Sequence, residues 1–172
     1  GRLSNQKKLV SDPRVYFYND FSNGSDSTVL EAWRTNQKII NSNPDEKFSP
    51  LYGETLQVTI NKGSHLGASK HFKLDQLKLN EAFFRYHLRF GDSWEAITGG
   101  KLPGFAGTFS STSAAAGWGG RKSNGNNGWS ARGAFGTTTS QINAVPNKTP
   151  LGIYLYHADM KNTWGDQIAF NQ

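Results

Sequence analysis

The sequence predicts an all-β fold, a β-sandwich or jelly roll with a concave, basic sheet face. Its 172 residues include 19 glycines, 11 phenylalanines, 6 tyrosines and 5 tryptophans, and this composition favours short strands and tight turns over helices. Several segments also alternate apolar and polar residues, as half-buried strands do. The length suits a single domain over residues 1–172, and a concave sheet face would make a groove for a linear polymer.

The first half of the chain holds one clear strand pattern and two weaker ones. Residues 56–60 alternate apolar and polar side chains, with Leu56, Val58 and Ile60 on one face. Residues 15–18 are all β-branched or aromatic and also predict a strand. Residues 29–40 fit either a short helix or an irregular strand, and the sequence leaves that choice open.

Residues 84–90 predict a strand with one apolar face and one basic face. The basic face carries Arg85, His87 and Arg89, and three such side chains in one row are unusual. Exposed arginines are ordinary on a sheet, but these three can point the same way as the tyrosines near the C-terminus. We therefore predict that they bind an acidic substrate.

Two tyrosines share a strand face near the C-terminus. Side chains alternate between the two faces of a sheet, so residues two apart share a face. If Ile153 and Leu155 enter a core, Tyr154 and Tyr156 stand together on the other side of the sheet. His157 falls on the face of Ile153, where a satisfied buried or turn histidine is expected. Tyrosines in strands also serve as packing residues, so this pair alone does not decide its role.

Three further polar residues are predicted to converge with these tyrosines. Ser130 and Arg132 share a face by the same alternation, and Lys101 lies in a glycine-rich segment at residues 99–104. An arginine can hold a carboxylate with two parallel hydrogen bonds, and a lysine adds a compact charge. The serine can add a hydrogen bond to a sugar.

This set of side chains suits the cleavage of a uronic acid polymer by β-elimination. A base removes the proton on C5 beside the carboxylate, the C4–O4 bond breaks, and an acid can protonate the leaving oxygen. Positive groups stabilise the charge that develops, and a tyrosine can be the base or the acid. Neighbouring cations are expected to lower the tyrosine pKa from its usual value of about 10. The sequence does not show which tyrosine is the base.

A basic loop rich in glycine and asparagine occupies residues 117–128. Loops of this length often carry function, and this one can flank or cover a binding groove. Trp118 and Arg121 lie in it and are candidate substrate-binding residues. The alternative is a solvated hairpin tip.

The net charge of +6 predicts an anionic partner, here an anionic polysaccharide. The chain has no cysteine, which excludes disulfides and thiolate chemistry. It also has no apolar run of about 18 residues, so no membrane partner is predicted. No histidine pair has ligand spacing with a carboxylate partner, so neither a metal nor another cofactor is expected.

Two other functions compete with catalysis. A non-catalytic carbohydrate-binding jelly-roll module is the alternative, because jelly rolls serve both roles and exposed tryptophans can stack on sugars. Nucleic-acid binding ranks lower. The charge permits it, but no recognition helix or aromatic-basic signature is present, so no nucleic-acid partner is predicted.

Residues 83–159 resemble the family 14 polysaccharide lyases, which cleave alginate or glucuronan. The resemblance is carried by residues 84–90, by Gly-Gly-Lys-Leu-Pro-Gly at 99–104, by Trp-Ser-Ala-Arg at 129–132 and by Tyr-Leu-Tyr-His-Ala-Asp at 154–159. It implies a jelly roll with a basic cleft and a metal-independent lyase reaction. The family's catalytic lysine falls on Lys101, its serine and arginine on Ser130 and Arg132, and its tyrosines on Tyr154 and Tyr156. Such an enzyme is expected to be secreted or extracellular.

The resemblance also bears on the extent of the domain. Family members usually continue for several strands beyond the Tyr-x-Tyr segment, whereas this sequence ends at Gln172. A sandwich cut at that point would leave an open sheet edge. We therefore expect these residues to be the N-terminal part of a longer domain, with a second chain or segment completing the sandwich.

Overall fold

The computed structural model describes residues 9, 11–22, 37–42, 47–51, 53–64, 67–68, 71, 74, 79–94, 99–108, 115–136 and 150–170. They fall into two compact units, Gly1–Asn80 and Glu81–Gln172. Across these ranges the regular structure is β-strand apart from one helical position at Leu9. The predicted all-β class is confirmed, and the two antiparallel sheets are consistent with a β-sandwich. None of the helical structure in these ranges has the length and apolar character of a membrane span.

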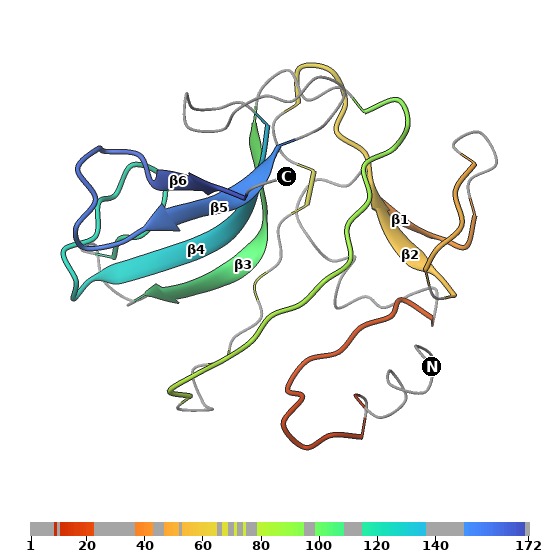
Figure 1. The fold of residues 1–172 in the computed structure, drawn as a ribbon, viewed down its shortest axis with the longest axis horizontal. Coiled ribbons are helices and arrows are strands. Elements are labelled where there is room, and N and C mark those ends of the chain that lie inside the picture. Colours follow the sequence, from red (N-terminus) through yellow and green to blue (C-terminus); the bar gives the residue numbers. More distant parts are fainter. Residues whose placement is uncertain are drawn as a thin grey trace. The chain divides into compact units, whose positions relative to one another are not determined.

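The first unit contains a two-stranded antiparallel ribbon (Figure 1). It consists of β1 (Gln37–Ile40) and β2 (Thr55–Val58), with Ile39 opposite Leu56. The strand predicted at residues 56–60 is confirmed in part, since it ends before Ile60. β1 also shows that the end of the ambiguous stretch at 29–40 is a strand, while residues 29–36 lie outside the described residues.

The strand predicted at residues 15–18 is wrong. These residues lie outside any strand, and Tyr16 is 55% exposed. The Val15 amide donates to the Asp12 carbonyl at 2.9 Å, so the segment leaves directly from a turn. A high β-propensity records how well side chains pack on neighbouring strands, and it does not create a strand by itself.

The second unit is built on a four-stranded antiparallel sheet with the order β3-β4-β5-β6. Its strands are β3 (Gly100–Thr108), β4 (Gly128–Phe135), β5 (Leu151–Tyr156) and β6 (Asp166–Ala169). They run from green to blue in Figure 1, each beside the strand that follows it in sequence. The sheet is therefore a meander, in which every strand pairs with its sequence neighbours.

A β-bulge in β3 decides which face its side chains take. Lys101 pairs with Ala134 and Gly104 pairs with Arg132, so three steps along β3 match two steps along β4. The extra residue lets Lys101 and Gly104 share a face, although an odd spacing would separate them in a regular strand. Pro103, which has no amide hydrogen to donate, lies inside this irregular stretch.

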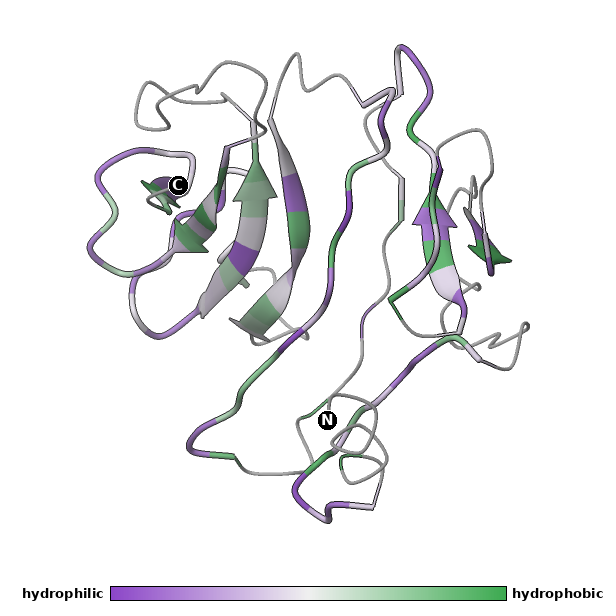
Figure 2. Cartoon of the chain, turned by 45° about the vertical axis from the view of Figure 1, so that its right-hand side comes forward, coloured by the Kyte–Doolittle hydropathy of each residue, from purple (hydrophilic) through white to green (hydrophobic). Residues whose placement is uncertain are grey.

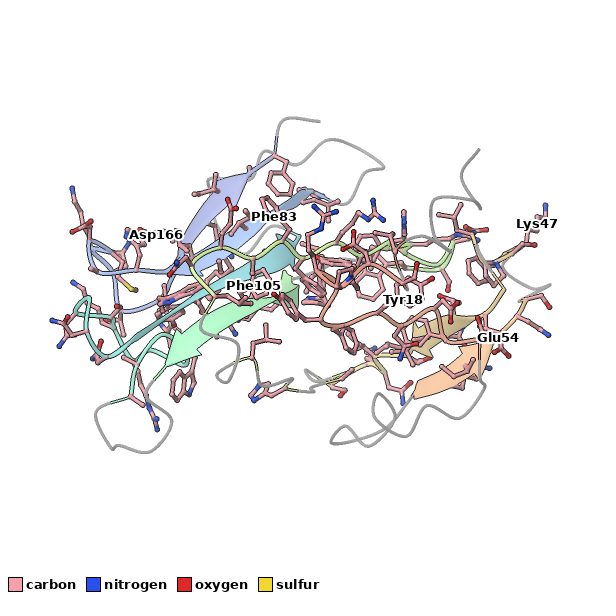
Figure 3. The ribbon with its side chains drawn as sticks, turned by 90° about the horizontal axis from the view of Figure 1, so that it is seen from below. Tyr18, Lys47, Glu54, Phe83, Phe105 and Asp166 are labelled. Carbon is pink, nitrogen blue, oxygen red and sulfur yellow. The ribbon has the colours of Figure 1, made fainter. Side chains whose placement is uncertain are left out.

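Residues 81–94 lie against one face of this sheet, which we call the aromatic face because it carries Phe105 and Phe135. The ring of Phe84 lies 5.7 Å from that of Phe105, which Figure 3 labels on β3. The ring of Phe90 lies 5.5 Å from that of Phe135 on β4. These ring contacts hold the segment to the sheet without any strand pairing.

The strand predicted at residues 84–90 is therefore wrong. The alternation of hydrophobic and hydrophilic residues along this segment is visible in Figure 2, yet the segment forms no strand. The Tyr86 hydroxyl lies so close to Gly133 of β4 that a β-carbon at Gly133 would overlap it. The period of two here reflects packing of one side of an extended chain on a sheet.

The opposite face of the sheet forms the buried core of the unit. Ala134, Tyr154, Tyr156 and Met160 are buried together there. The prediction that the two tyrosines line an open sheet surface is wrong, because Met160 is buried with them and the amides of Gly120 and Gly165 bond their hydroxyls. We call this the tyrosine face. Whether it is concave and basic overall stays a prediction.

Candidate active site

The strand register brings five polar side chains to the tyrosine face. Ser130 pairs with Tyr156, and Arg132 pairs with Tyr154, across β4 and β5. Cross-strand pairs lie on the same face of a sheet, and the bulge in β3 puts Lys101 on that face too. Alternation in the sequence predicted that Ser130 shares a face with Arg132 and that the two tyrosines share one, while the bulge decides the face of Lys101. The catalytic roles of the five residues stay predictions.

Two cations lie over the ring of Tyr154. Lys101 Nζ is 4.6 Å from the ring centroid, and Arg132 Cζ is 5.4 Å from it. Arg132 Cζ also lies 6.0 Å from the ring centroid of Tyr156. Cations within about 6 Å of an aromatic face are attracted by the negative quadrupole of the ring. The tyrosine rings therefore help to hold two like charges in one small site.

Arg132 has more hydrogen-bonding capacity than the described residues satisfy. Its Nε and Nη2 atoms are buried and have no hydrogen-bond partner among them. Burial lowers the pKa of Arg132 from its usual value. Lys101 is exposed as a whole, but partial burial of its ammonium lowers its pKa, and repulsion from Arg132 lowers it further. An anion bound here would accept the unmade hydrogen bonds and offset part of the positive charge.

The two tyrosine hydroxyls are held by backbone amides of glycines. Gly165 N–H donates to the Tyr154 hydroxyl and Gly120 N–H donates to the Tyr156 hydroxyl, each at 3.0 Å. The Tyr154 hydroxyl in turn donates to the Tyr156 oxygen over 3.5 Å, a long hydrogen bond. Tyr154 is 6% exposed and Tyr156 is 0% exposed, so neither phenol meets bulk water.

Burial sets the proton affinity of Tyr154. It raises the pKa of this tyrosine to about 12, and the hydrogen bond to Tyr156 acts in the same direction. The Gly165 amide and the Arg132 charge act the other way but are outweighed. The expectation that cations would lower the pKa is therefore wrong for Tyr154. The cost of placing a phenolate away from water exceeds the attraction of the nearby charge.

A tight turn at residues 117–121, which we call the cover turn, closes over the Tyr156 hydroxyl. The Arg121 amide donates to the Trp118 carbonyl at 2.9 Å. Between them, Gly119 and Gly120 have φ angles of +57° and +77°, as a type I′ turn requires at both central positions. This backbone conformation, which glycine adopts at little cost, aims the Gly120 amide at Tyr156.

Ser130 anchors the cover turn to the sheet. Its hydroxyl is buried and donates to the Gly117 carbonyl at 2.6 Å. A serine hydroxyl has one hydrogen to donate, and here the protein itself takes it. The sequence predicted that Ser130 would hydrogen-bond a sugar. In this structure its donor instead fixes the start of the turn that covers Tyr156.

The predicted substrate-binding residues fall into two places. Trp118 and Arg121 belong to the cover turn, where Arg121 Cζ stacks 5.3 Å from the Trp118 ring centroid. Arg85, His87 and Arg89 are exposed on the segment that packs against the aromatic face, and Arg89 pairs with Asp92 at 2.9 Å. The structure therefore does not bring this basic row to the tyrosine face, and its role in binding stays a prediction.

Sequence reasoning missed the groups that surround the phenols. Gly120 and Gly165 donate to the two hydroxyls, and Trp164, which is 62% exposed, lies beside the cover turn. The available signal was that each donor glycine lies one or two positions after a tryptophan, in Trp-Gly-Gly at 118–120 and Trp-Gly at 164–165. In the part of the chain that the structure describes, no three His, Cys, Asp or Glu side chains gather as metal ligands would.

Comparison with known families gives the class of protein. The model of the Polysaccharide lyase 14 family matches residues 51–141, more than half of the chain. The chain therefore belongs to the polysaccharide lyase 14 family, as the resemblance in its sequence motifs indicated. The match includes Lys101, Ser130 and Arg132 and ends before Tyr154 and Tyr156. No curated protein and no solved structure match the chain.

Proposed function

We propose that this protein is a lyase that cleaves a uronic acid polymer, alginate or glucuronan, by metal-independent β-elimination. Its membership of a polysaccharide lyase family supports the reaction class. The observation that carries the proposal is Arg132, whose buried Nε and Nη2 have no partner among the described residues and which shares the ring of Tyr154 with Lys101. A uronate carboxylate has the charge and the paired oxygens to satisfy both cations.

The proposed reaction breaks the C5–H and C4–O4 bonds of one uronic acid residue and forms a double bond between C4 and C5. A base takes the proton from C5, and the electron pair of that C–H bond forms a C4=C5 double bond. The C4–O4 bond breaks, its electron pair leaves on O4, and an acid gives O4 a proton. One proton is taken and one is given, so no water, oxidant or reductant is consumed. The products are a shortened polymer and a chain that begins with an unsaturated uronate.

The two cations act on the carboxylate. Negative charge grows on that group as the C5 proton leaves, because the carbanion delocalises into it. Arg132 and Lys101 stabilise this charge, and pre-placed donors of this kind are often the largest catalytic contribution. Losing one such donor typically lowers kcat by about 10²–10³-fold.

The two tyrosines supply the base and the acid. The Tyr154 proton is engaged with the Tyr156 oxygen, and burial keeps the pKa of Tyr154 high. We therefore assign Tyr154 as the acid, which stays protonated until the leaving oxygen needs a proton. Tyr156 is the base, and it first gives its own phenolic proton to solvent once the cover turn has moved, so that its phenolate meets the C5 proton. A positioned acid or base typically accelerates a reaction by about 10²–10⁴-fold.

Substrate has to shift the cover turn to reach the Tyr156 hydroxyl, and the Gly165 amide to reach the Tyr154 hydroxyl. Hydrogen bonds from Gly120 to Tyr156 and from Ser130 to Gly117 hold the turn down. Each contributes about 1 kcal/mol net, a cost that contacts with a bound polymer can offset. Lys101 is exposed and would meet the polymer first.

A non-catalytic carbohydrate-binding module is the second candidate, and the burial of the phenols favours it. A general base has to come within about 3 Å of the proton that it takes. Tyr154 and Tyr156 are too enclosed for this unless the turn moves. In that case Lys101 and Arg132 would bind a uronate and leave the polymer intact.

The deciding experiment follows the ultraviolet absorbance of the unsaturated product. The protein is incubated with alginate and with glucuronan from neutral to alkaline pH, with and without EDTA. We expect absorbance to rise, to be unaffected by EDTA and to be lost in Tyr156→Phe and Lys101→Ala. The matched controls Tyr16→Phe and Lys62→Ala change exposed residues of the other unit and should behave as wild type. Binding without any shortening of the polymer would establish the module instead.

We also propose an anionic polysaccharide as the partner and a secreted or extracellular location. The net charge of +6 supports attraction to a polyanion, which should weaken as salt rises. A polymer of this kind does not cross a membrane intact, which supports a location outside the cell for an enzyme that shortens polymer from its surroundings.

A further inference from the structure

We propose that Trp164 and the cover turn form a platform that binds the uronic acid residue next to the one that is cleaved. This ligand class rests on the proposed function. Trp164 is 62% exposed, and the proposed reaction does not use it. A single exposed tryptophan needs no explanation by itself. The position of Trp164, beside the glycines that hold the two phenols, does call for an explanation.

Trp164 is next to one of the two glycines that hold the phenols and near the other. The residue after it, Gly165, donates to Tyr154, and Gly120 donates to Tyr156. A β-carbon at Gly120 would lie 3.6 Å from Trp164 Cη2 and 3.7 Å from Cζ3. The outer edge of the indole therefore rests against the cover turn. A group stacked on this ring would lie beside the tyrosine pair.

The chemistry of the platform fits a charged sugar. The flat side of a pyranose presents C–H bonds, which suit the electron-rich face of an indole. Arg121 lies in the same turn, directly after Gly120, and its guanidinium stacks 5.3 Å from the Trp118 ring centroid. An arginine fixed in this way can accept a carboxylate on its edge while its flat side stays on the tryptophan. The platform thus offers a surface for the ring and a charge for its carboxylate.

The test measures binding in a Lys101→Ala background, which should prevent cleavage and leaves both glycine-to-tyrosine hydrogen bonds in place. A uronic acid oligomer and a neutral oligomer of equal length are titrated by calorimetry. Trp164→Ala should weaken binding of both by about tenfold, equal to about 1.4 kcal/mol. Arg121→Gln should weaken binding of the uronate oligomer only. Trp164→Phe, which keeps a ring, should restore part of the affinity.

Trp129→Ala is the matched control, because Trp129 is 46% exposed and lies on the opposite face of the sheet from Ser130. Equal affinities in Trp164→Ala and Trp129→Ala, with both variants folded by thermal unfolding, would overturn the platform. The outcome is separable from the lyase proposal. A wild-type protein that forms no unsaturated product but binds less after Trp164→Ala keeps the platform and loses the lyase. If the wild-type protein forms the unsaturated product and Trp164→Ala leaves binding unchanged, the lyase proposal stands and the platform is rejected.

Discussion

The Gly120 amide donates a 3.0 Å hydrogen bond to the hydroxyl of Tyr156, a residue 36 positions later in the chain. The same oxygen accepts from Tyr154 and is our proposed base. Tyr156 thus serves two purposes, because it closes a turn onto the sheet and is poised for proton transfer. Loss of activity in a Tyr156 variant has meaning only if the fold is shown to be intact, so stability has to be measured beside activity.

Ser130→Ala is expected to loosen the cover turn. It removes the donor to the Gly117 carbonyl and should lower the free energy of unfolding by about 1 kcal/mol, the net value of a hydrogen bond. Urea denaturation measures this change. Ser42→Ala, at an exposed position, is the control and should have no effect. Equal stabilities of the two variants would show that Ser130 does not anchor the turn.

Arg132→Met is expected to separate stability from activity. Methionine removes a buried charge whose Nε and Nη2 have no partner among the described residues, so the free energy of unfolding should stay the same or rise by about 1 kcal/mol. The rate of product formation should fall by about 10²–10³-fold. Denaturation measures the stability and the absorbance assay measures the rate. Lys161→Met, at an exposed position, is the control. A clear loss of stability would mean that Arg132 serves the fold.

Tyr154 should make the protein less stable at high pH. Its pKa is raised to about 12, so the native state holds this proton more tightly than the unfolded chain does. The resulting stability is complete below the unfolded pKa of about 10 and is lost as pH rises toward the native value. Unfolding measured between about pH 9 and 12 should show this decline, and Tyr154→Phe should reduce it. If Tyr154→Phe and Tyr16→Phe give the same slope, the assignment fails.

Gly133→Ala should displace residues 81–94 from the aromatic face. A β-carbon at this position overlaps the Tyr86 hydroxyl and approaches Leu102 Cβ to 2.9 Å. Overpacking of this kind costs about 1–3 kcal/mol. Adding Tyr86→Phe removes the oxygen that clashes and should recover part of the loss, while the contact with Leu102 remains. Thermal unfolding of the single and double variants checks this, and purely additive effects would argue against the clash.

Two pairs that share a strand face could be predicted because strand alternation is a local property, whereas the face of Lys101 depends on the bulge in β3. Ser130 and Arg132 are two apart, as are Tyr154 and Tyr156, and this spacing survives whatever the rest of the chain does. Which face is buried depends on distant segments. Nothing near Tyr154 indicates that glycine amides from residues 120 and 165 would cover its neighbourhood. The sequence could therefore predict which residue shares a strand face with each tyrosine, but not how exposed that face is.

The basic row illustrates the same limit. The alternation at residues 84–90 correctly separates apolar from basic side chains, since Phe84 and Phe90 contact the sheet and Arg85 is exposed. It cannot say whether the segment pairs with a strand or lies across a sheet face, because both give a period of two. That choice decides whether Arg85 stands near Lys101, and it depends on long-range packing.

The number of residues in the irregular stretch of β3 decides on which face of the sheet Lys101 lies. Between Lys101 and Gly104 the strand has one residue more than its partner needs. Deleting Leu102 should give an even ladder that keeps the ammonium on the side of Arg132. If β3 kept its length but paired regularly with β4, the Lys101 ammonium would lie on the face of Phe105. Pro103 disfavours such regular pairing because it has no amide hydrogen. The reach of this lysine toward a sugar acid is thus governed by spacing as much as by chemistry.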